Sequence, residues 1–149
     1  MRVALGADHG GFSLKETIKE YLQAREMEVI DAGTDSEEPV DYPLYGFQVG
    51  RMIQKGEADR GIVICGTGLG ISMAANKVRG VRAVMCTDPY SARLAREHNN
   101  ANVLALGGRV TGAGLALEIV DVFLRTEFSG EERHQRRIGQ MMTLEEGEE

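Results

Sequence analysis

The residues with the clearest capacity for chemistry lie in one stretch, from Arg60 to Ser72. Its apolar run Gly61–Ile64 is rich in β-branched residues and predicts a buried strand. Cys65 follows this strand directly, and glycines then occupy every second position from Gly66 to Gly70. A loop between the carboxyl end of a strand and the amino end of a helix points several backbone N–H groups at one spot. We therefore expect a cradle for an anion, either a phosphate or an oxyanion that forms during a reaction, with a thiol at its base.

Cys65 has two possible roles. A free cysteine is most often a small core residue. At a strand end, however, the backbone amides of the following loop favour the thiolate, so we interpret Cys65 as reactive. Cys86 lies within an apolar stretch and is interpreted as a core residue. The glycine loop matches neither the G-x-G-x-x-G pattern of dinucleotide sites nor a P-loop, because Ile71 and Ser72 follow Gly70 where a P-loop has lysine and then serine or threonine.

Histidines and arginines elsewhere in the chain are further candidates. His98 falls at the end of an expected helix, where the helix dipole alone would favour it. Arg133 and Arg137 are four residues apart and so share one face of a helix. Such a pair could grip a phosphate in a bidentate manner, or it could form a solvated basic patch. The residues alone leave both interpretations open.

Apolar stretches alternate with amphipathic or capped segments along the chain. The expected strands are Val3–Gly6, Glu28–Asp31, Gly61–Ile64, Val81–Cys86 and Val103–Leu106. The expected helices begin near Ser13, Pro43, Ile71, Pro89 and Gly112, and the last of them runs to Arg125. This alternation predicts an α/β fold, a three-layer, doubly wound (Rossmann-like) five-stranded parallel sheet with helices on both faces.

In a doubly wound sheet, ligands bind beyond the carboxyl ends of the strands, near the point where the strand order reverses. Polar candidates follow four of the five expected strands: Asp8, His9, Cys65, Thr67, Asp88 and Arg109. We therefore expect these side chains to meet at one edge of the sheet and to form the site there.

Length and charge restrict the remaining possibilities. The 149 residues predict a single domain over residues 1–149, with a charged, helical C-terminal tail from about residue 131 whose end, 145–149, is expected to fray. The net charge of −6 argues against nucleic-acid binding.

Two cysteines without C-x-x-C spacing indicate neither a disulfide framework nor a metal site, and free thiols fit a reducing cytoplasm. The apolar runs are too short for a signal peptide or a membrane span.

Several motifs occur in the order of a known family over nearly the whole chain, from about Arg2 to Ile138. They are Gly6-Ala7-Asp8-His9-Gly10-Gly11 with Lys15, Asp41-Tyr42-Pro43, Cys65-Gly66-Thr67-Gly68-Leu69-Gly70 with Asn76-Lys77, His98-Asn99 with Asn102, Gly107-Gly108-Arg109, and Arg133-His134 with Arg137. This pattern resembles the ribose-5-phosphate isomerase B family. The resemblance implies a doubly wound sandwich that interconverts ribose 5-phosphate and ribulose 5-phosphate without a metal or cofactor. It also implies a homodimer, or a dimer of dimers, with active sites at the subunit interface.

The resemblance implies roles for individual residues as well. Cys65 matches the general base, His98 the proton donor that helps to open the furanose ring, and Thr67 the hydroxyl that assists His98. The residues that match substrate or phosphate contacts are Asp8, His9, Gly66, Gly68, Leu69, Gly70, Asn99, Arg109, Arg133 and Arg137. Some of these contacts are expected to reach across from the partner subunit.

Two rival functions are weighed against this one. An isomerase of a six-carbon sugar phosphate, such as allose 6-phosphate or galactose 6-phosphate, would share the loop and the base. A non-catalytic module that binds a sugar phosphate or nucleotide could use the same cradle, but it would need neither Cys65 nor His98. The chain departs from the family pattern at Gly130-Glu131-Glu132-Arg133-His134, which is one residue longer than the usual motif and carries two acidic residues.

Overall fold

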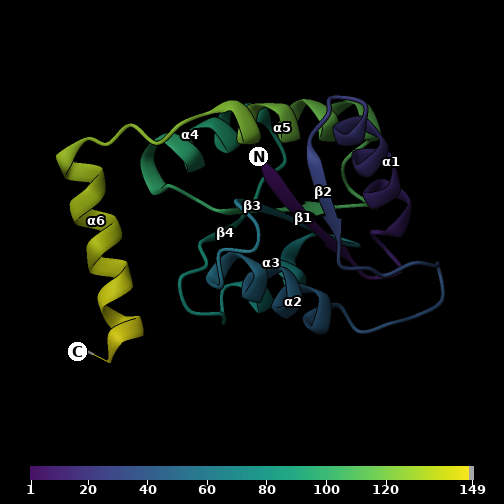
Figure 1. Cartoon of the computed structure of the whole chain (residues 1–149), viewed down its shortest axis with the longest axis horizontal. Coiled ribbons are helices and arrows are strands. Elements are labelled where there is room, and N and C mark those ends of the chain that lie inside the picture. Colours follow the sequence, from purple (N-terminus) through teal and green to yellow (C-terminus); the bar gives the residue numbers. More distant parts are fainter. Residues whose placement is uncertain (148–149) are drawn as a thin grey trace.

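The computed structural model describes residues 1–147 and is drawn in Figure 1. The described strands are β1 (Arg2–Ala7), β2 (Glu28–Asp31), β3 (Arg60–Cys65), β4 (Ala83–Met85) and β5 (Val103–Gly107). The described α-helices are α1 (Phe12–Gln23), α2 (Tyr42–Gln54), α3 (Leu69–Ala75), α4 (Pro89–Asn99), α5 (Ala113–Arg125) and α6 (Glu132–Thr143), and the 3₁₀ turn η1 (Leu144–Glu146) follows α6. Of the predicted frayed end, residues 148–149 lie outside the described residues.

The five strands form one sheet in the order β2-β1-β3-β5-β4, and every neighbouring pair is parallel. Helices α1, α4 and α5 cover one face of the sheet, and α2 and α3 cover the other (Figure 1). The predicted three-layer, doubly wound sheet is therefore confirmed. Its strand order reverses between β1 and β3, so the carboxyl ends of these two strands form the switch point where a ligand is expected.

Side chains alternate between the two faces along each strand. On β1, Val3 and Leu5 pack into the core beneath α1, α4 and α5, whereas Ala4 packs into the core beneath α2 and α3. On β3, Ile64 belongs to the first core and Cys65 to the second. The position of Cys65 in this alternation directs its thiol toward the layer that contains α2 and α3.

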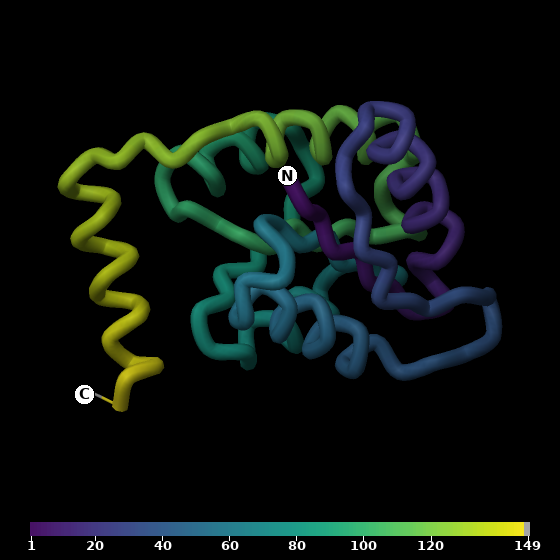
Figure 2. The backbone as a smooth tube through the Cα atoms, in the orientation of Figure 1, coloured from purple at the N-terminus to yellow at the C-terminus, as the bar shows by residue number. Residues whose placement is uncertain are grey.

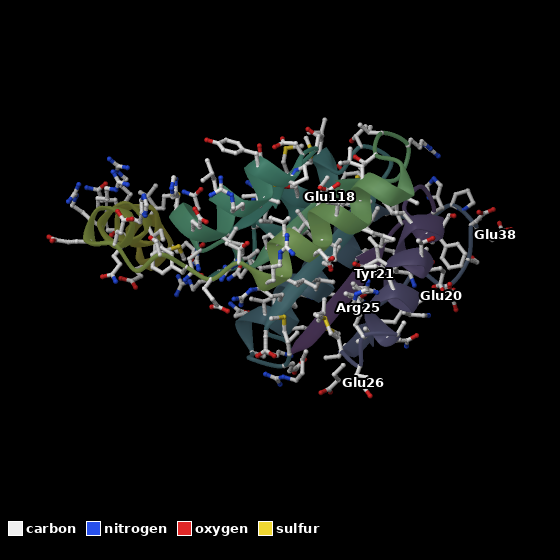
Figure 3. The ribbon with its side chains drawn as sticks, turned by 90° about the horizontal axis from the view of Figure 1, so that it is seen from above. Glu20, Tyr21, Arg25, Glu26, Glu38 and Glu118 are labelled. Carbon is white, nitrogen blue, oxygen red and sulfur yellow. The ribbon has the colours of Figure 1, made fainter. Side chains whose placement is uncertain are left out.

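Helices α1 and α5 pack side by side in the layer that also contains α4 (Figure 3). The Tyr21 hydroxyl on α1 donates a hydrogen bond of 2.7 Å to the Asp121 carboxylate on α5. The Arg25 guanidinium lies 3.4 Å from the centroid of the Tyr21 ring, a cation–π contact. No helix within residues 1–147 combines the length and the apolar character that a membrane span requires.

Strand β4 is shorter than the sequence predicts. It covers Ala83–Met85, whereas a strand over Val81–Cys86 is expected from the apolar run. The Arg82 N–H donates instead to the side-chain oxygen of Asn102 at 2.8 Å, so this residue does not pair regularly with the sheet. Cys86 lies just past the strand, but it is buried as predicted.

Helix α3 begins two residues earlier than the predicted start at Ile71. Gly68 adopts a left-handed backbone with φ of +81°, and the helix starts immediately after it at Leu69. The Thr67 hydroxyl oxygen accepts the Leu69 N–H at 3.2 Å and satisfies one of the free amides of the first turn. Gly70 therefore belongs to the helix rather than to the loop.

A buried cation fixes the end of β2 against α1. The Lys15 side chain is fully buried, and its ammonium lies 2.8 Å from both carboxylate oxygens of Asp31. Burial raises the pKa of Asp31, but hydrogen bonds from Lys15 and Lys19 and from the Gly33 N–H outweigh it, and the net shift is downward. Gly33 in turn accepts a hydrogen bond from the Ala7 N–H at the end of β1. The ion pair therefore stabilises the backbone from which Asp8 projects.

Replacing Lys15 with methionine should lower the free energy of unfolding at pH 7 by about 2 kcal/mol, because the Asp31 carboxylate loses its buried partner. The folded-state pKa of Asp31 is depressed, so this stabilisation is present above the unfolded pKa of about 3.9 and is lost as pH falls through the folded value. Chemical denaturation of wild type and Lys15→Met at several pH values measures the difference, which should shrink in acid. Lys19→Met is the control, since Lys19 pairs with the same Asp31 carboxylate but is more exposed. Equal losses for both variants would contradict the role of burial.

Candidate active site

The Cys65 thiol lies at the carboxyl end of β3, directly beneath the glycine loop. The side chain is buried, and its Sγ accepts a hydrogen bond from the Gly68 N–H at 3.1 Å. The loop after β5 closes the other side of this backbone, because the Gly108 N–H donates to the Cys65 carbonyl at 2.8 Å. The expected arrangement of a thiol with a loop amide directed at it is present.

Gly68 makes this arrangement possible. Its φ of +81° is a conformation that L side chains rarely adopt. A Cβ on this residue would lie 2.9 Å from both the Leu106 carbonyl carbon and the Met85 Cγ, so no side chain fits there. The chain therefore turns tightly enough to bring the Gly68 N–H back onto the thiol of Cys65.

Asp8 and His9 reach the same edge from the end of β1. The buried Asp8 carboxylate accepts hydrogen bonds from the N–H groups of Gly10 at 2.9 Å and Gly11 at 3.2 Å, which fixes the loop. His9 Nδ1 accepts the Val40 N–H at 3.1 Å. Since Nδ1 is the acceptor, the neutral ring carries its proton on Nε2, which can donate to a ligand.

Arg109 lies across the glycine loop from the end of β5. Its N–H donates to the Gly66 carbonyl at 3.0 Å, and its guanidinium Nη1 would lie 3.3 Å from a Cβ on Gly66. We call the residues gathered here the carboxyl-edge cluster: Asp8, His9, Cys65, Gly66, Thr67, Gly68, Leu69, Gly70 and Arg109. Asp88 follows β4 but caps α4, where its carboxylate accepts the Ser91 N–H at 2.7 Å.

Tyr42 belongs to the same edge and was not predicted as a site residue. A Cβ on Gly70 would lie 2.6 Å from the Tyr42 Cζ, so the phenol ring packs directly against the glycine loop. The signal in the sequence is the Asp41-Tyr42-Pro43 turn at the start of α2. In the sequence, that turn indicates only the start of a helix. The packing of α2 in the fold brings the Tyr42 ring to the glycine loop.

Four predicted site residues lie at the opposite edge of the sheet. His98 and Asn99 end α4, and the short segment Asn100–Asn102 leads from them into the amino end of β5. The Asn102 carbonyl accepts the Gly61 N–H near the amino end of β3, which places this turn at the amino edge. Five residues of β5 at about 3.3 Å each separate the two edges by about 16 Å.

Arg133 and Arg137 lie on α6, which stands at the end of the molecule next to α4 (Figures 1 and 2). The His98 ring stacks on the buried His134 ring of α6, with centroids 4.2 Å apart and an interplanar angle of 28°. Burial, with His98 and nearby arginines, lowers the pKa of His134. We call His98, Asn99, Arg133 and Arg137 the amino-edge cluster. Within one chain it cannot reach the ligand that the carboxyl-edge cluster would bind.

The segment Gly130–His134, which departs from the family pattern, leads into α6 and forms its first turn. Glu131 is the N-cap residue of the helix, and its carboxylate forms an exposed ion pair of 3.0 Å with the Arg133 guanidinium. An exposed pair of this kind contributes little to stability and is easily replaced by a ligand. Arg133 and Arg137 are both exposed and can therefore meet a phosphate.

Cys86 contrasts with Cys65. Burial raises the pKa of the Cys86 thiol to about 11, and the nearby Asp88 carboxylate adds to this shift. The thiol is therefore protonated at neutral pH, in agreement with a core residue. Among residues 1–147, no three His, Cys, Asp or Glu side chains converge closely enough to hold a metal ion.

Comparisons with known proteins find close relatives of the chain in sequence and in fold. Residues 3–141 match a family described as Ribose/Galactose Isomerase. The chain is 52% identical over 145 residues to a ribose-5-phosphate isomerase B of Escherichia coli (strain K12), with 97% of each chain covered. It is 44% identical over 138 residues to a galactose-6-phosphate isomerase subunit LacB of Clostridium acetobutylicum, with 93% of this chain and 80% of the relative covered. A solved structure of a ribose-5-phosphate isomerase B from Clostridium thermocellum has a TM-score of 0.97 at 55% identity and covers 99% of both chains.

Replacing Gly68 with alanine should cost about 1–2 kcal/mol of unfolding free energy from the left-handed backbone alone, and more from the contacts with Leu106 and Met85. Gly80→Ala is the matched control, because Gly80 has a φ of +84° and no atom within 4 Å of its Cβ position. Thermal and chemical unfolding of both variants should show Gly68→Ala to be clearly less stable. Equal losses would mean that the contacts beneath the loop carry no strain.

Proposed function

The chain belongs to the ribose/galactose isomerase family, of the ribose-5-phosphate isomerase B type, and from this premise we propose how its residues interconvert ribose 5-phosphate and ribulose 5-phosphate. It is an aldose–ketose isomerase. The observation that carries the mechanism is the Cys65 thiol beneath the Gly68 N–H at the switch point of the sheet.

The reaction moves one proton between neighbouring carbons. In the open-chain aldose, Cys65 as thiolate removes the proton from C2, and the electron pair of that bond forms an enediolate with negative charge on the C1 oxygen. The Cys65 thiol then returns the proton to C1 while the proton of the C2 hydroxyl passes to the C1 oxygen, which leaves the ketose and regenerates the thiolate. Because no electrons leave the sugar, the proposed reaction requires no redox cofactor, and we propose that backbone amides rather than a metal stabilise the enediolate.

The glycine loop has two tasks in this proposal. The Gly68 N–H donates to Sγ of Cys65 and holds the sulfur in place beneath the loop. Other backbone amides between Gly66 and Gly70 face the developing enediolate oxygen, where one oriented donor typically contributes about 3 kcal/mol. The buried carboxylate of Asp8 and the ring of His9 contact the sugar beside the loop, and Arg109 closes the site from β5.

The amino-edge cluster completes the site from a second copy of the chain. His98 protonates the ring oxygen of the furanose, assisted by the Thr67 hydroxyl, so that the ring opens before Cys65 acts. Asn99 contacts the substrate, and Arg133 and Arg137 bind the phosphate. The separation of the two clusters within one chain supports this assignment, because a partner related by two-fold symmetry could bring each cluster to the other. We therefore propose a homodimer, alone or paired into a tetramer.

A five-carbon substrate is favoured over a six-carbon one. The relatives with identities of 52% and 55% are named for ribose 5-phosphate, whereas the relative named for galactose 6-phosphate is 44% identical. Turnover of ribose 5-phosphate should therefore exceed turnover of allose 6-phosphate. We also propose that residues 1–149 form one domain, and that two free thiols reflect a reducing, cytoplasmic location.

Cys65→Ala should lower turnover of ribose 5-phosphate by about 10²–10⁴-fold, the usual contribution of a positioned base, while the protein still folds. Formation of ribulose 5-phosphate in the presence of EDTA measures this and tests metal independence in the same assay. Cys86→Ala removes the other thiol, which lies outside the site, and should retain turnover. Comparable activity in Cys65→Ala and Cys86→Ala would remove Cys65 as the base.

Mixing two inactive chains tests the shared site directly. In a mixed dimer of Cys65→Ala and His98→Asn chains, one site has both wild-type residues and the other has neither. Random assembly makes half of the dimers mixed, so the mixture should regain about a quarter of wild-type turnover. No recovery after dissociation and reassembly would show that each chain builds its own site.

A further inference from the structure

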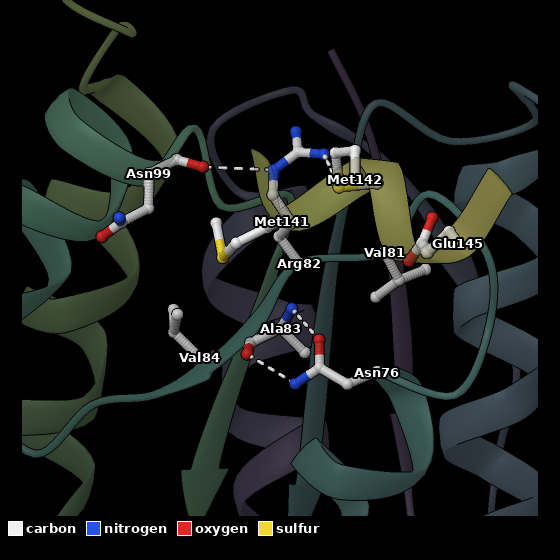
Figure 4. A pocket seen from close by; sticks show the side chains of 9 residues that line it. All are labelled: Asn76, Val81, Arg82, Ala83, Val84, Asn99, Met141, Met142 and Glu145. Atoms are coloured by element: carbon white, nitrogen blue, oxygen red, sulfur yellow. Dashed lines mark hydrogen bonds between the residues drawn. The ribbon is translucent and has the colours of Figure 1, made fainter. Parts of the chain in front are cut away.

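Arg82 lies between the end of α4 and α6, the two elements that carry the amino-edge cluster (Figure 4). Its Nε donates to the carbonyls of Asn99 at 3.1 Å and Asn100 at 3.2 Å, and its Nη2 donates to the Asn100 carbonyl at 2.9 Å. Its Nη1 donates to the Met142 sulfur at 3.7 Å. One guanidinium therefore contacts the last turn of α4 and the last turn of α6 together.

The hydrogen bonds from Arg82 Nε and Nη2 go to backbone carbonyls at the carboxyl end of α4. The last four carbonyls of an α-helix have no partner within the helix. At the end of α4, Asn100 turns the chain with a left-handed φ of 46°, which is uncommon for a residue other than glycine. The planar fork of Arg82 satisfies two consecutive carbonyls at this turn with charge-assisted hydrogen bonds. A lysine has no such fork and would hold the turn less firmly.

The backbone of Arg82 is itself firmly held. Its N–H donates to the Asn102 side chain at 2.8 Å, and its carbonyl accepts the Asn102 N–H at 3.1 Å. The next residue, Ala83, exchanges two hydrogen bonds with the Asn76 side chain, at 2.8 and 2.9 Å. The guanidinium therefore projects from a fixed point just before β4 and contacts the end of α4 from there.

An ordinary ion pair does not account for Arg82. Among the described residues, its hydrogen bonds go to backbone carbonyls and a sulfur atom, whereas the neighbouring Glu145 carboxylate accepts the Gly80 N–H at 2.8 Å. Burial lowers the pKa of the Arg82 guanidinium; the charge of the Glu145 carboxylate opposes this shift, and the positive charge of Arg60 adds to it. Burying this charge costs free energy, and the hydrogen bonds to the turn at the end of α4 offset that cost.

We propose that Arg82 is a positioning residue for ring opening, which holds His98 at the angle that the partner's site requires. The proposal rests on the proposed function of the amino-edge cluster. Arg82 does not touch the substrate. It acts through the turn at Asn99 and Asn100, and the residue directly before that turn is His98.

The test uses the two substrates of the reaction. Ribose 5-phosphate is largely a closed furanose, whereas the phosphate on the C5 oxygen prevents ribulose 5-phosphate from closing the corresponding ring. Exchange of the C1 proton of ribulose 5-phosphate with deuterated water therefore needs the Cys65 step but no ring opening. Arg82→Met should lower kcat for ribose 5-phosphate about tenfold or more and should change the exchange rate about threefold at most, because a misplaced acid affects only ring opening. Arg82→Lys should fall between wild type and Arg82→Met.

Two reference variants make the result decisive. His98→Asn should show the same split between the substrates as Arg82→Met, in a stronger form. Arg79→Met removes a nearby arginine that bonds to the Glu145 carbonyl in the same tail, and it should leave both rates near wild type. Thermal unfolding shows whether each variant is folded. If Arg82→Met does not fold, Arg82→Lys replaces it in both assays.

Three outcomes would overturn the proposal. Equal losses in both assays for Arg82→Met would indicate a purely structural role, and rates like those of Arg79→Met would indicate none. If His98→Asn retains turnover of ribose 5-phosphate while Arg82→Met loses it, Arg82 acts through another group, and the role of His98 fails as well. Absence of both activities in the wild type would overturn the proposed function itself, whatever the variants show.

Discussion

The parallel direction of all five strands is the constraint on which the rest of the structure depends. Each strand ends at one edge of the sheet, and each helix that returns the chain ends at the other. Side chains that follow strands, such as Cys65 and Asp8, therefore gather at the carboxyl edge. His98 and Asn99 follow a helix and must lie at the amino edge. A site that uses residues of both kinds, as we propose, therefore needs a second copy of the chain, and this need follows from the topology alone.

The alternation of apolar runs and amphipathic segments was sufficient to predict the sheet and its layers, because side-chain periodicity is a local property. The group at the carboxyl edge was predictable for the same reason, since a strand end can be located from the strand. What could not be predicted depends on contacts between distant residues. The shortening of β4 results from the Asn102 side chain, twenty positions away, and the Tyr42 ring reaches the glycine loop only after α2 packs. Whether Arg133 and Arg137 bind phosphate also depends on which copy they face.

Buried cations stabilise the connections of this fold. Lys15 joins α1 to the end of β2, and Arg82 joins α4 to α6. Arg96 is almost fully buried and donates from Nε to the Thr126 carbonyl at 3.1 Å, joining α4 to the end of α5; burial lowers its pKa to about 10. Arg82 and Arg96 supply several donors where the chain leaves a helix and its carbonyls lack partners, whereas Lys15 pairs with the Asp31 carboxylate at the end of β2. The cost of burying the charge is offset there by hydrogen bonds that an apolar side chain could not make.

The brevity of β4 also determines how copies of the chain can meet. It is one of the two outer strands of the sheet and has three residues; the other, β2, has four. An outer strand exposes unpaired backbone groups, and a long one invites a strand from another molecule to extend the sheet. These two strands are too short to direct such pairing. In the homodimer that we propose, copies would instead recognise one another through side chains and helices, while polymerisation along the sheet is discouraged.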